Sequence, residues 1–189
     1  MKNTVIILGD SPFLEEVKWE LRYVLDRYHS IGINNVITKY YTNEHIFVDM
    51  PFVSLTNQFI GRTVTLKTYE GLIPKEDKYL IDSYSFDFNK NTVNDICLED
   101  RIAWCGFTHD YAISYCIKQK YKKIILIGAG DFTLGSHFSN NHSFRFSYTL
   151  RENSKKFIED YASKVIQIET CNPNSYLNIP RVSLSDLLK

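Results

Sequence analysis

Two glycine-containing stretches carry the residue types best suited to ligand binding. Gly9-Asp10-Ser11-Pro12 follows one short apolar run, and Gly128-Ala129-Gly130-Asp131 follows another. Glycine lets the backbone approach a ligand closely, and backbone amides with the Ser11 hydroxyl can bind a phosphate at the start of a helix. The Asp10 carboxylate would repel a phosphate, so a turn capped by Asp10 or Ser11 is the alternative. Asp131 suits a ribose or sugar hydroxyl, with a structural carboxylate at the strand end as the alternative.

The polar segment after the second stretch holds two histidines, His137 and His142. Histidine titrates near neutral pH, so either side chain is a candidate general base, and a merely solvated histidine is the alternative. The segment from Gly128 to Ser143 is rich in Gly, Ser, Asn and His and shows no helical or strand pattern. A loop of this length is usually functional, and we expect it to form a lid over the binding pocket.

Several well-understood kinds of site are excluded by the sequence. It contains no GxGxxG or Walker phosphate loop, no GxSxG nucleophile elbow and no CxxC pair. Lys plus Arg and Asp plus Glu both number 22, so the charge gives no reason to expect nucleic acid as a partner. The apolar run Thr4–Leu8 is far shorter than the roughly 20 residues of a spanning helix. We therefore expect a cytoplasmic protein without a membrane-spanning segment or a metal cofactor.

Four elements position these candidate residues. Thr4–Leu8 and Ile124–Ile127 are apolar on both faces, which is typical of parallel strands in the interior of a sheet. Phe13–Tyr28 places apolar residues at helical spacing and predicts an amphipathic helix. A second helix is predicted over Thr108–Lys120, with the Thr108 hydroxyl as its N-cap. Both glycine stretches thus follow buried strands.

The order of elements predicts the fold class. A length of 189 residues with 44% apolar residues suits one core, so we expect a single domain over 1–189. The alternation predicts an α/β fold, a doubly wound, mainly parallel, Rossmann-like sheet with helices on both faces. Its cleft should lie at the loops after Leu8, Ile33, Val48 and Ile127. The other expected elements are strands Ser30–Asn34, His45–Asp49 and Val165–Ile168, short strands or loops inserted over Arg62–Phe88, helix Ser147–Ala162, and a tail helix begun by Ser183 and Asp186.

Six short motifs occur in a fixed order along the chain and together resemble a known family. They are Gly9-Asp10-Ser11-Pro12-Phe13-Leu14, Gly32-Ile33-Asn34, Val48-Asp49-Met50-Pro51, Cys105-Gly106, Gly128-Ala129-Gly130-Asp131-Phe132 and Asn172-Pro173-Asn174-Ser175. In the same order they are similar to Gly-Asn-Gly-Pro-Ser-Leu, Arg-Cys-Asn, Tyr-Asn-Pro, Ser-Gly, Ser-Gly-Ile-Asp-Phe and Cys-Pro-Asn-Ser of the bacterial lipooligosaccharide sialyltransferases. The chain resembles, more loosely, the MptE-like domains related to motility accessory factors.

The resemblance implies a function and a site. It implies a glycosyltransferase-like enzyme that uses a nucleotide-activated sugar, most naturally a cytidine monophosphate sugar, by direct displacement and without a metal. The family's histidine base would fall near Ser147 or Tyr148, where the nearest histidine of this chain is His142, and His137 is the other candidate. The residues then expected to bind the donor are Gly9, Asp10, Ser11, Asn34, Asp49, Gly106, Gly130, Asp131, Asn174 and Ser175.

Two other functions are compatible with the same residues. The first is a protein that binds or sequesters a nucleotide or nucleotide sugar without catalysis. The second is an MptE-like pyrophosphokinase, in which Asp10, Asp49 or Asp131 would hold Mg²⁺ with a nucleoside triphosphate. The sequence does not specify the acceptor or the oligomeric state.

Overall fold

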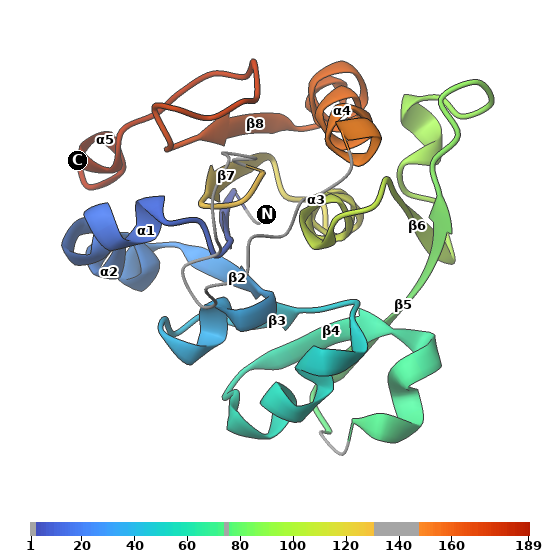
Figure 1. Cartoon of the computed structure of the whole chain (residues 1–189), viewed down its shortest axis with the longest axis horizontal. Helices are drawn as coiled ribbons and strands as arrows, with labels where there is room; N and C mark the ends of the chain where they lie inside the picture. The colour runs from blue at the N-terminus through green and yellow to red at the C-terminus, as the bar shows by residue number, and fades with distance from the viewer. Residues whose placement is uncertain (1–2, 74–75, 131–147) are drawn as a thin grey trace.

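A computed structural model describes residues 3–73, 76–130 and 148–189 of the chain. In these residues eight strands form one sheet in the order β6-β5-β4-β3-β2-β1-β7-β8 (Figure 1). All seven strand pairs are parallel, so the predicted α/β fold with a parallel, Rossmann-like sheet is confirmed. The strands are β1 (Thr4–Leu8), β2 (His29–Ile33), β3 (Glu44–Ile46), β4 (Arg62–Leu66), β5 (Lys78–Ser85), β6 (Arg101–Trp104), β7 (Lys123–Ile127) and β8 (Gln167–Thr170).

Helices cover both faces of this sheet. The α-helices are α1 (Phe13–Glu16), α2 (Lys18–Arg27), α3 (Thr108–Lys118), α4 (Tyr148–Lys156) and α5 (Leu184–Leu187). Shorter turns are η1 (Asn34–Thr38), η2 (Met50–Gln58), η3 (Lys67–Leu72), η4 (Val93–Asp95), the π-helical η5 (Phe157–Tyr161) and η6 (Ala162–Lys164). Across the described ranges, none of the helices has the length and apolar character needed to cross a membrane.

The two strands predicted to be interior lie at the centre of the sheet. β1 pairs with β2 on one side and with β7 on the other. Successive side chains of a strand point to opposite faces, so β1 contributes to two separate cores. Ile6 and Leu8 pack with residues of α1, α2 and α5, whereas Val5 and Ile7 pack with residues of α3. This double burial explains why both faces of the strand are apolar.

The sheet curls around α3. This helix contacts β6 as well as β1 and β2, although these strands lie far apart in the strand order. Figure 1 shows α3 on the inner side of the curve, with β6 on one side and β7 on the other. Every residue from Thr108 to Cys116 is buried as a result. The curl of the sheet thus covers this helix on opposite sides.

Several predicted boundaries were wrong for local reasons. The segment Arg62–Phe88 does not hold inserted strands, because β4 and β5 belong to the main sheet. Strand β6 was missed: it has four residues and begins with an exposed arginine. The helix predicted over Phe13–Tyr28 is interrupted at Val17, whose φ of −115° and ψ of 16° leave the helical range.

The N-cap predicted at Thr108 was also wrong. Phe107 occupies the N-cap position, and Thr108 is the first helical residue. The Asp110 carboxylate accepts a hydrogen bond from the Phe107 amide at 3.1 Å and so supplies the cap from within the first turn. The tail helix follows its prediction, because the Ser183 hydroxyl accepts a hydrogen bond from the Asp186 amide.

Both outer edges of the sheet are paired with short local segments. On β8, the Thr170 amide donates to the Pro180 carbonyl and the Val182 amide donates to the Thr170 carbonyl. On β6, the Leu98 amide donates to the Arg101 carbonyl, and Cys97 forms an antiparallel bridge with Ile102. These contacts satisfy backbone groups that an open edge strand would expose.

A buried carboxylate connects the strands at the amino-terminal end of the sheet. Glu44, only 3% exposed at the start of β3, accepts a hydrogen bond from the Tyr115 hydroxyl at 2.7 Å and lies 3.1 Å from His29 Nε2. Burial alone would raise the pKa of this carboxyl, but the hydrogen bonds from His29 and Tyr115 and the charges of His29 and Arg62 outweigh it and lower the pKa. The ionised form is therefore stabilised in the folded protein.

We predict that Glu44→Ala lowers the free energy of unfolding by about 1–3 kcal/mol at pH 7, because the buried Tyr115 hydroxyl loses its acceptor. A lowered folded pKa stabilises the fold above the ordinary carboxyl pKa of 4.5, and this contribution disappears as the pH falls through the lowered value. In urea denaturation, the difference in unfolding free energy between wild type and variant should therefore become smaller below about pH 4.5. Glu99→Ala, at an exposed position, is the control and should change stability by less than about 0.5 kcal/mol.

Candidate functional site

The strand order reverses at β1, which places a crevice at the carboxyl ends of β1 and β7. Strands β2 to β6 lie on one side of β1 in the sheet, whereas β7 and β8 lie on its other side. Ligands of open α/β sheets bind at such a reversal. The loops after the two strands touch each other: the Gly9 amide donates to the Ile127 carbonyl at 2.9 Å and the Ser11 amide to the Gly128 carbonyl at 3.2 Å. The two glycine stretches therefore lie side by side, as predicted.

Gly9 is needed for the contact between these loops. A Cβ at this position would lie 2.3 Å from the Gly128 carbonyl oxygen, closer than any real Cβ contact. Ser11 is 8% exposed, and its hydroxyl accepts a hydrogen bond from the Phe13 amide at 3.3 Å. Both residues thus have structural roles in the turn, in agreement with the turn alternative considered for this stretch.

The loop after β8 packs against the loop after β7. Gly130 has a left-handed φ of 69°, and a Cβ there would lie 3.1 Å from Leu177 Cδ1. In the β8 loop, the Asn172 side chain accepts a hydrogen bond from the Asn174 amide at 2.9 Å, and the Ser175 hydroxyl accepts one from the Leu177 amide at 3.3 Å. The predicted residues Asn174 and Ser175 thus lie next to the crevice in a loop that Asn172, only 3% exposed, holds in shape.

Asn34 presents an amide oxygen that the described residues leave unsatisfied. It follows β2 with a left-handed φ of 53°, and its backbone carbonyl lies 2.9 Å from the Nε2 of buried His45. Its Oδ1 atom is buried, and the part of the chain that the structure describes offers it no hydrogen-bond partner. Buried polar atoms are nearly always paired in native proteins, so this oxygen is a candidate acceptor for a ligand N–H or O–H group.

Asp49 lies one strand further along the same edge. It is the N-cap residue of η2, but its carboxylate makes no cap hydrogen bond. The residue is exposed, and partial desolvation by neighbouring groups raises the pKa of its carboxyl. Burial, with a smaller contribution from the charge of Asp49, raises the pKa of Tyr111 to about 12, and the Tyr69 hydroxyl donates to the carbonyl of the preceding residue, Val48. Asp49 therefore offers a free acceptor in a partly desolvated place.

The amino-terminal end of α3 is occupied by side chains of the protein itself. His109 Nε2 lies 2.9 Å from the Ser154 hydroxyl, which donates to Asp110 Oδ1 at 2.6 Å. Because Ser154 gives its proton to Asp110, it must accept from His109, which makes Nε2 the protonated nitrogen of the neutral ring. Burial lowers the pKa of His109 and raises that of Asp110. His109 is only 6% exposed, because the curled sheet and α4 both cover the start of α3.

Gly106 is placed against α4 rather than against the glycine loops. Its φ is +128°, and a Cβ there would lie 2.8 Å from Leu150 Cδ2. The predicted role of Gly106 in donor binding therefore has a packing explanation as well. The remaining predicted positions, Asp131, His137 and His142, lie outside the described residues, as does most of the expected lid.

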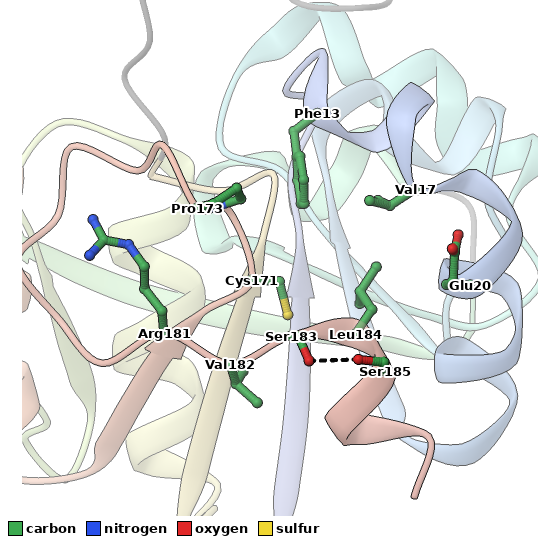
Figure 2. A pocket seen from close by; sticks show the side chains of 10 residues that line it. All are labelled: Phe13, Val17, Glu20, Cys171, Pro173, Arg181, Val182, Ser183, Leu184 and Ser185. Carbon is green, nitrogen blue, oxygen red and sulfur yellow. Dashed lines mark hydrogen bonds between the residues drawn. The ribbon is translucent and has the colours of Figure 1, made fainter.

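A pocket of about 450 Å³ borders the crevice on the side of α1 and α2. Figure 2 shows Phe13, Val17 and Glu20 on one side of it, with Cys171 and Pro173 on the other. None of the predicted donor-binding residues lines it, although Phe13 and Pro173 belong to the loops that hold Ser11 and Asn174. The other lining residues are Arg181, Val182, Ser183, Leu184 and Ser185.

No group of three or more His, Cys, Asp or Glu side chains suited to a metal ion occurs within residues 3–73, 76–130 and 148–189. Asp49 is one of the three carboxylates that the magnesium alternative offers, the others being Asp10 and Asp131, and the last lies outside those ranges. Asp10, the other described one, begins the loop that contacts Gly128.

Comparisons with known proteins establish the fold. No protein-family model and no curated protein matches the chain. Among solved structures, the chain is similar to the MAf glycosyltransferase from Magnetospirillum magneticum AMB-1, with a TM-score of 0.67 and 11% sequence identity. The similarity covers 98% of this chain and 34% of that protein, so the chain spans about a third of its neighbour. At this identity the likeness shows a shared fold.

We predict that Gly9→Ala destabilises the protein by about 1–3 kcal/mol, because the added Cβ forces the two loops apart. Gly71→Ala is the matched control, since a Cβ there meets no atom within 4 Å, and it should cause no loss of stability. Thermal unfolding of both variants measures the difference. Equal melting temperatures would show that the loops do not contact each other as described.

Proposed function

We propose that this chain is a glycosyltransferase-like domain that binds a nucleotide-activated sugar, of the cytidine monophosphate class, and transfers the sugar by direct displacement. The observation that carries the proposal is the buried Asn34 oxygen, which the described residues leave unsatisfied at the end of β2, next to the reversal of strand order at β1. The structural likeness to a glycosyltransferase and the order of motifs along the chain support the same class.

The geometry suits the parts of such a donor. The Asn34 amide oxygen can accept a hydrogen bond from an exocyclic amino group of the base or from a ribose hydroxyl. Gly128 and Gly130 have left-handed backbone and pack against Leu14 and Leu177, so they shape the loop beside which the phosphate and ribose would lie. Asp49 can accept hydrogen bonds from hydroxyl groups, which are abundant on a sugar or an acceptor. The ligand would lie along the edge formed by β7, β1, β2 and β3.

We predict that the purified protein binds cytidine monophosphate and that Asn34→Ala weakens this binding by about 1–3 kcal/mol, or roughly 5- to 150-fold, because the ligand donor loses its partner. Isothermal titration calorimetry with cytidine, uridine, adenosine and guanosine monophosphates measures both the affinity and the choice of base. Asn178→Ala, which removes an exposed amide from the C-terminal segment, is the control and should bind like the wild type.

The same titration separates the alternatives. Absence of binding to every nucleotide would contradict the proposal. Binding of a nucleoside triphosphate only in the presence of Mg²⁺ would favour the pyrophosphokinase. Binding of cytidine monophosphate without transfer or hydrolysis of a cytidine monophosphate sugar would favour a binding or sequestering protein. His137 and His142 stay predictions from the sequence for the general base, and their alanine variants test them in the hydrolysis assay.

A further inference from the structure

The chain turns back on itself at Asn34, directly after β2. A Cβ at Gly32 would lie 2.8 Å from Val36 Cγ1 and 3.1 Å from Ile37 Cγ2, so η1 packs onto the end of this strand. The return begins at Asn34, whose φ of 53° is one that asparagine adopts more readily than most residues with a side chain. The turn therefore determines where the Asn34 side chain leaves the backbone.

The ring of His45 holds the Asn34 backbone from the neighbouring strand. His45 is fully buried on β3, and its Nε2 atom lies 2.9 Å from the Asn34 carbonyl oxygen. A carbonyl oxygen can only accept, so Nε2 carries the proton and donates it. Strand β3 lies between β2 and β4, and His45 is paired with Gly32 of β2. The hydrogen bond therefore ties the turn after β2 to the interior of the sheet.

Aromatic packing fixes the position of this imidazole. Its ring centroid lies 5.3 Å from that of Phe47 and 5.4 Å from that of Phe59, with interplanar angles of 38° and 62°. Both phenylalanines are themselves buried. Because the interior of a protein is closely packed, the imidazole can move away from Asn34 only if this group of rings opens. The His45 donor is therefore held in place independently of any ligand.

Asn34 carries both the carbonyl that His45 holds and the side-chain oxygen that the described residues leave unsatisfied. Only the side-chain torsions of Asn34 separate Oδ1 from the backbone, so a fixed backbone restricts where this acceptor can lie. An acceptor that is already in place costs less to order when a ligand binds, and a displacement of about 1 Å is enough to lose a hydrogen bond. Loss of the His45 donor should therefore affect ligand binding through Asn34.

We propose, resting on the function proposed above, that His45 is a positioning residue for nucleotide recognition. By holding the Asn34 carbonyl, His45 keeps Asn34 Oδ1 where a donor group of the ligand reaches it. Since Oδ1 can only accept, that group is an N–H or O–H, either the exocyclic amino group of cytosine or a ribose hydroxyl. In this role His45 touches no reacting atom and acts through Asn34 alone.

The test measures the affinity of the whole chain for cytidine monophosphate by calorimetry. His45→Phe keeps a ring beside Phe47 and Phe59 but removes the donor, and it should weaken binding by about 3- to 30-fold. His45→Leu, a smaller side chain without a donor, should give the same loss. His45→Gln offers an amide nitrogen near the place of Nε2 and should restore the affinity to within about threefold of the wild type.

Thr63→Val is the matched control for these variants. Thr63 is buried on β4, paired with His45, and its hydroxyl has no hydrogen-bond partner among the described residues. Valine has nearly the same shape, so this variant changes a buried side chain next to His45 without removing a donor from Asn34. Its affinity for cytidine monophosphate should equal that of the wild type.

A double-mutant cycle separates positioning from a general loss of structure. Asn34→Gly allows the left-handed backbone but removes Oδ1. In that background, His45→Phe should weaken binding by less than about twofold, because the acceptor that His45 holds in place is absent. An equal loss with and without Oδ1 would show that His45 only stabilises the fold, and would overturn the proposal.

Uridine monophosphate distinguishes the two donor groups, because uracil carries a carbonyl oxygen where cytosine carries its amino group. If His45→Phe weakens binding of cytidine monophosphate but not of uridine monophosphate, Oδ1 accepts from the base. Equal losses for the two nucleotides assign Oδ1 to the ribose. Either result supports the positioning role of His45.

A further measurement does not depend on a ligand. In NMR spectra of the wild type, the His45 ring should be protonated at Nε2. The side-chain amide signals of Asn34 should shift in His45→Phe and return in His45→Gln. Unmoved Asn34 signals, or wild-type affinity in His45→Phe, would overturn the role of His45 and leave nucleotide binding intact. A wild type that binds no nucleotide contradicts the function proposed above and, with it, the role of His45 in binding.

Discussion

The burial of α3 inside the curved sheet is the constraint on which the rest of the structure depends. A helix that touches β1, β2 and β6 requires the sheet to bend, and this bend brings Phe86, after β5, within ring contact of Phe157 and Tyr161. Because α3 is covered on every side, His109 and Asp110 near its start have to find partners inside the protein. Ser154 of α4 meets this need for His109 and Asp110 and thereby fixes α4 over the start of α3.

The central part of the fold could be predicted because local pattern and final environment agree there. β1 and β7 are apolar on both faces, and the glycines after them meet at the strand reversal as predicted. The other half of the sheet could not be predicted with the same rules. Strand β6 is short and carries Arg101 and Trp104 at its ends, and its place is set by contact with a helix that follows it in the chain. Packing between segments far apart in the chain produces no periodic pattern of apolar residues in the sequence, so the strand could not be predicted from one.

The candidate site shows a similar division. In a sequence, a glycine or hydroxyl residue that binds a ligand cannot be distinguished from one that stabilises a turn. Here Gly9 and Ser11 stabilise the turn after β1. Asn34 and Asp49 were named through the family resemblance, and they differ because their side-chain oxygens make no hydrogen bond to the described residues. Only the positions of the surrounding atoms distinguish a free side-chain oxygen from one used in a turn. The spacing of residues in the sequence does not reveal those positions.

The paired outer edges of the sheet have a consequence for how the protein associates with others. An uncovered parallel strand invites a foreign strand to add to the sheet, which leads to mispairing, domain exchange or aggregation. Here the segments at Pro180–Val182 and Ile96–Leu98 occupy the outward backbone groups of β8 and β6. A foreign strand therefore cannot add to the sheet at Thr170 or along Arg101–Ala103 without displacing these segments.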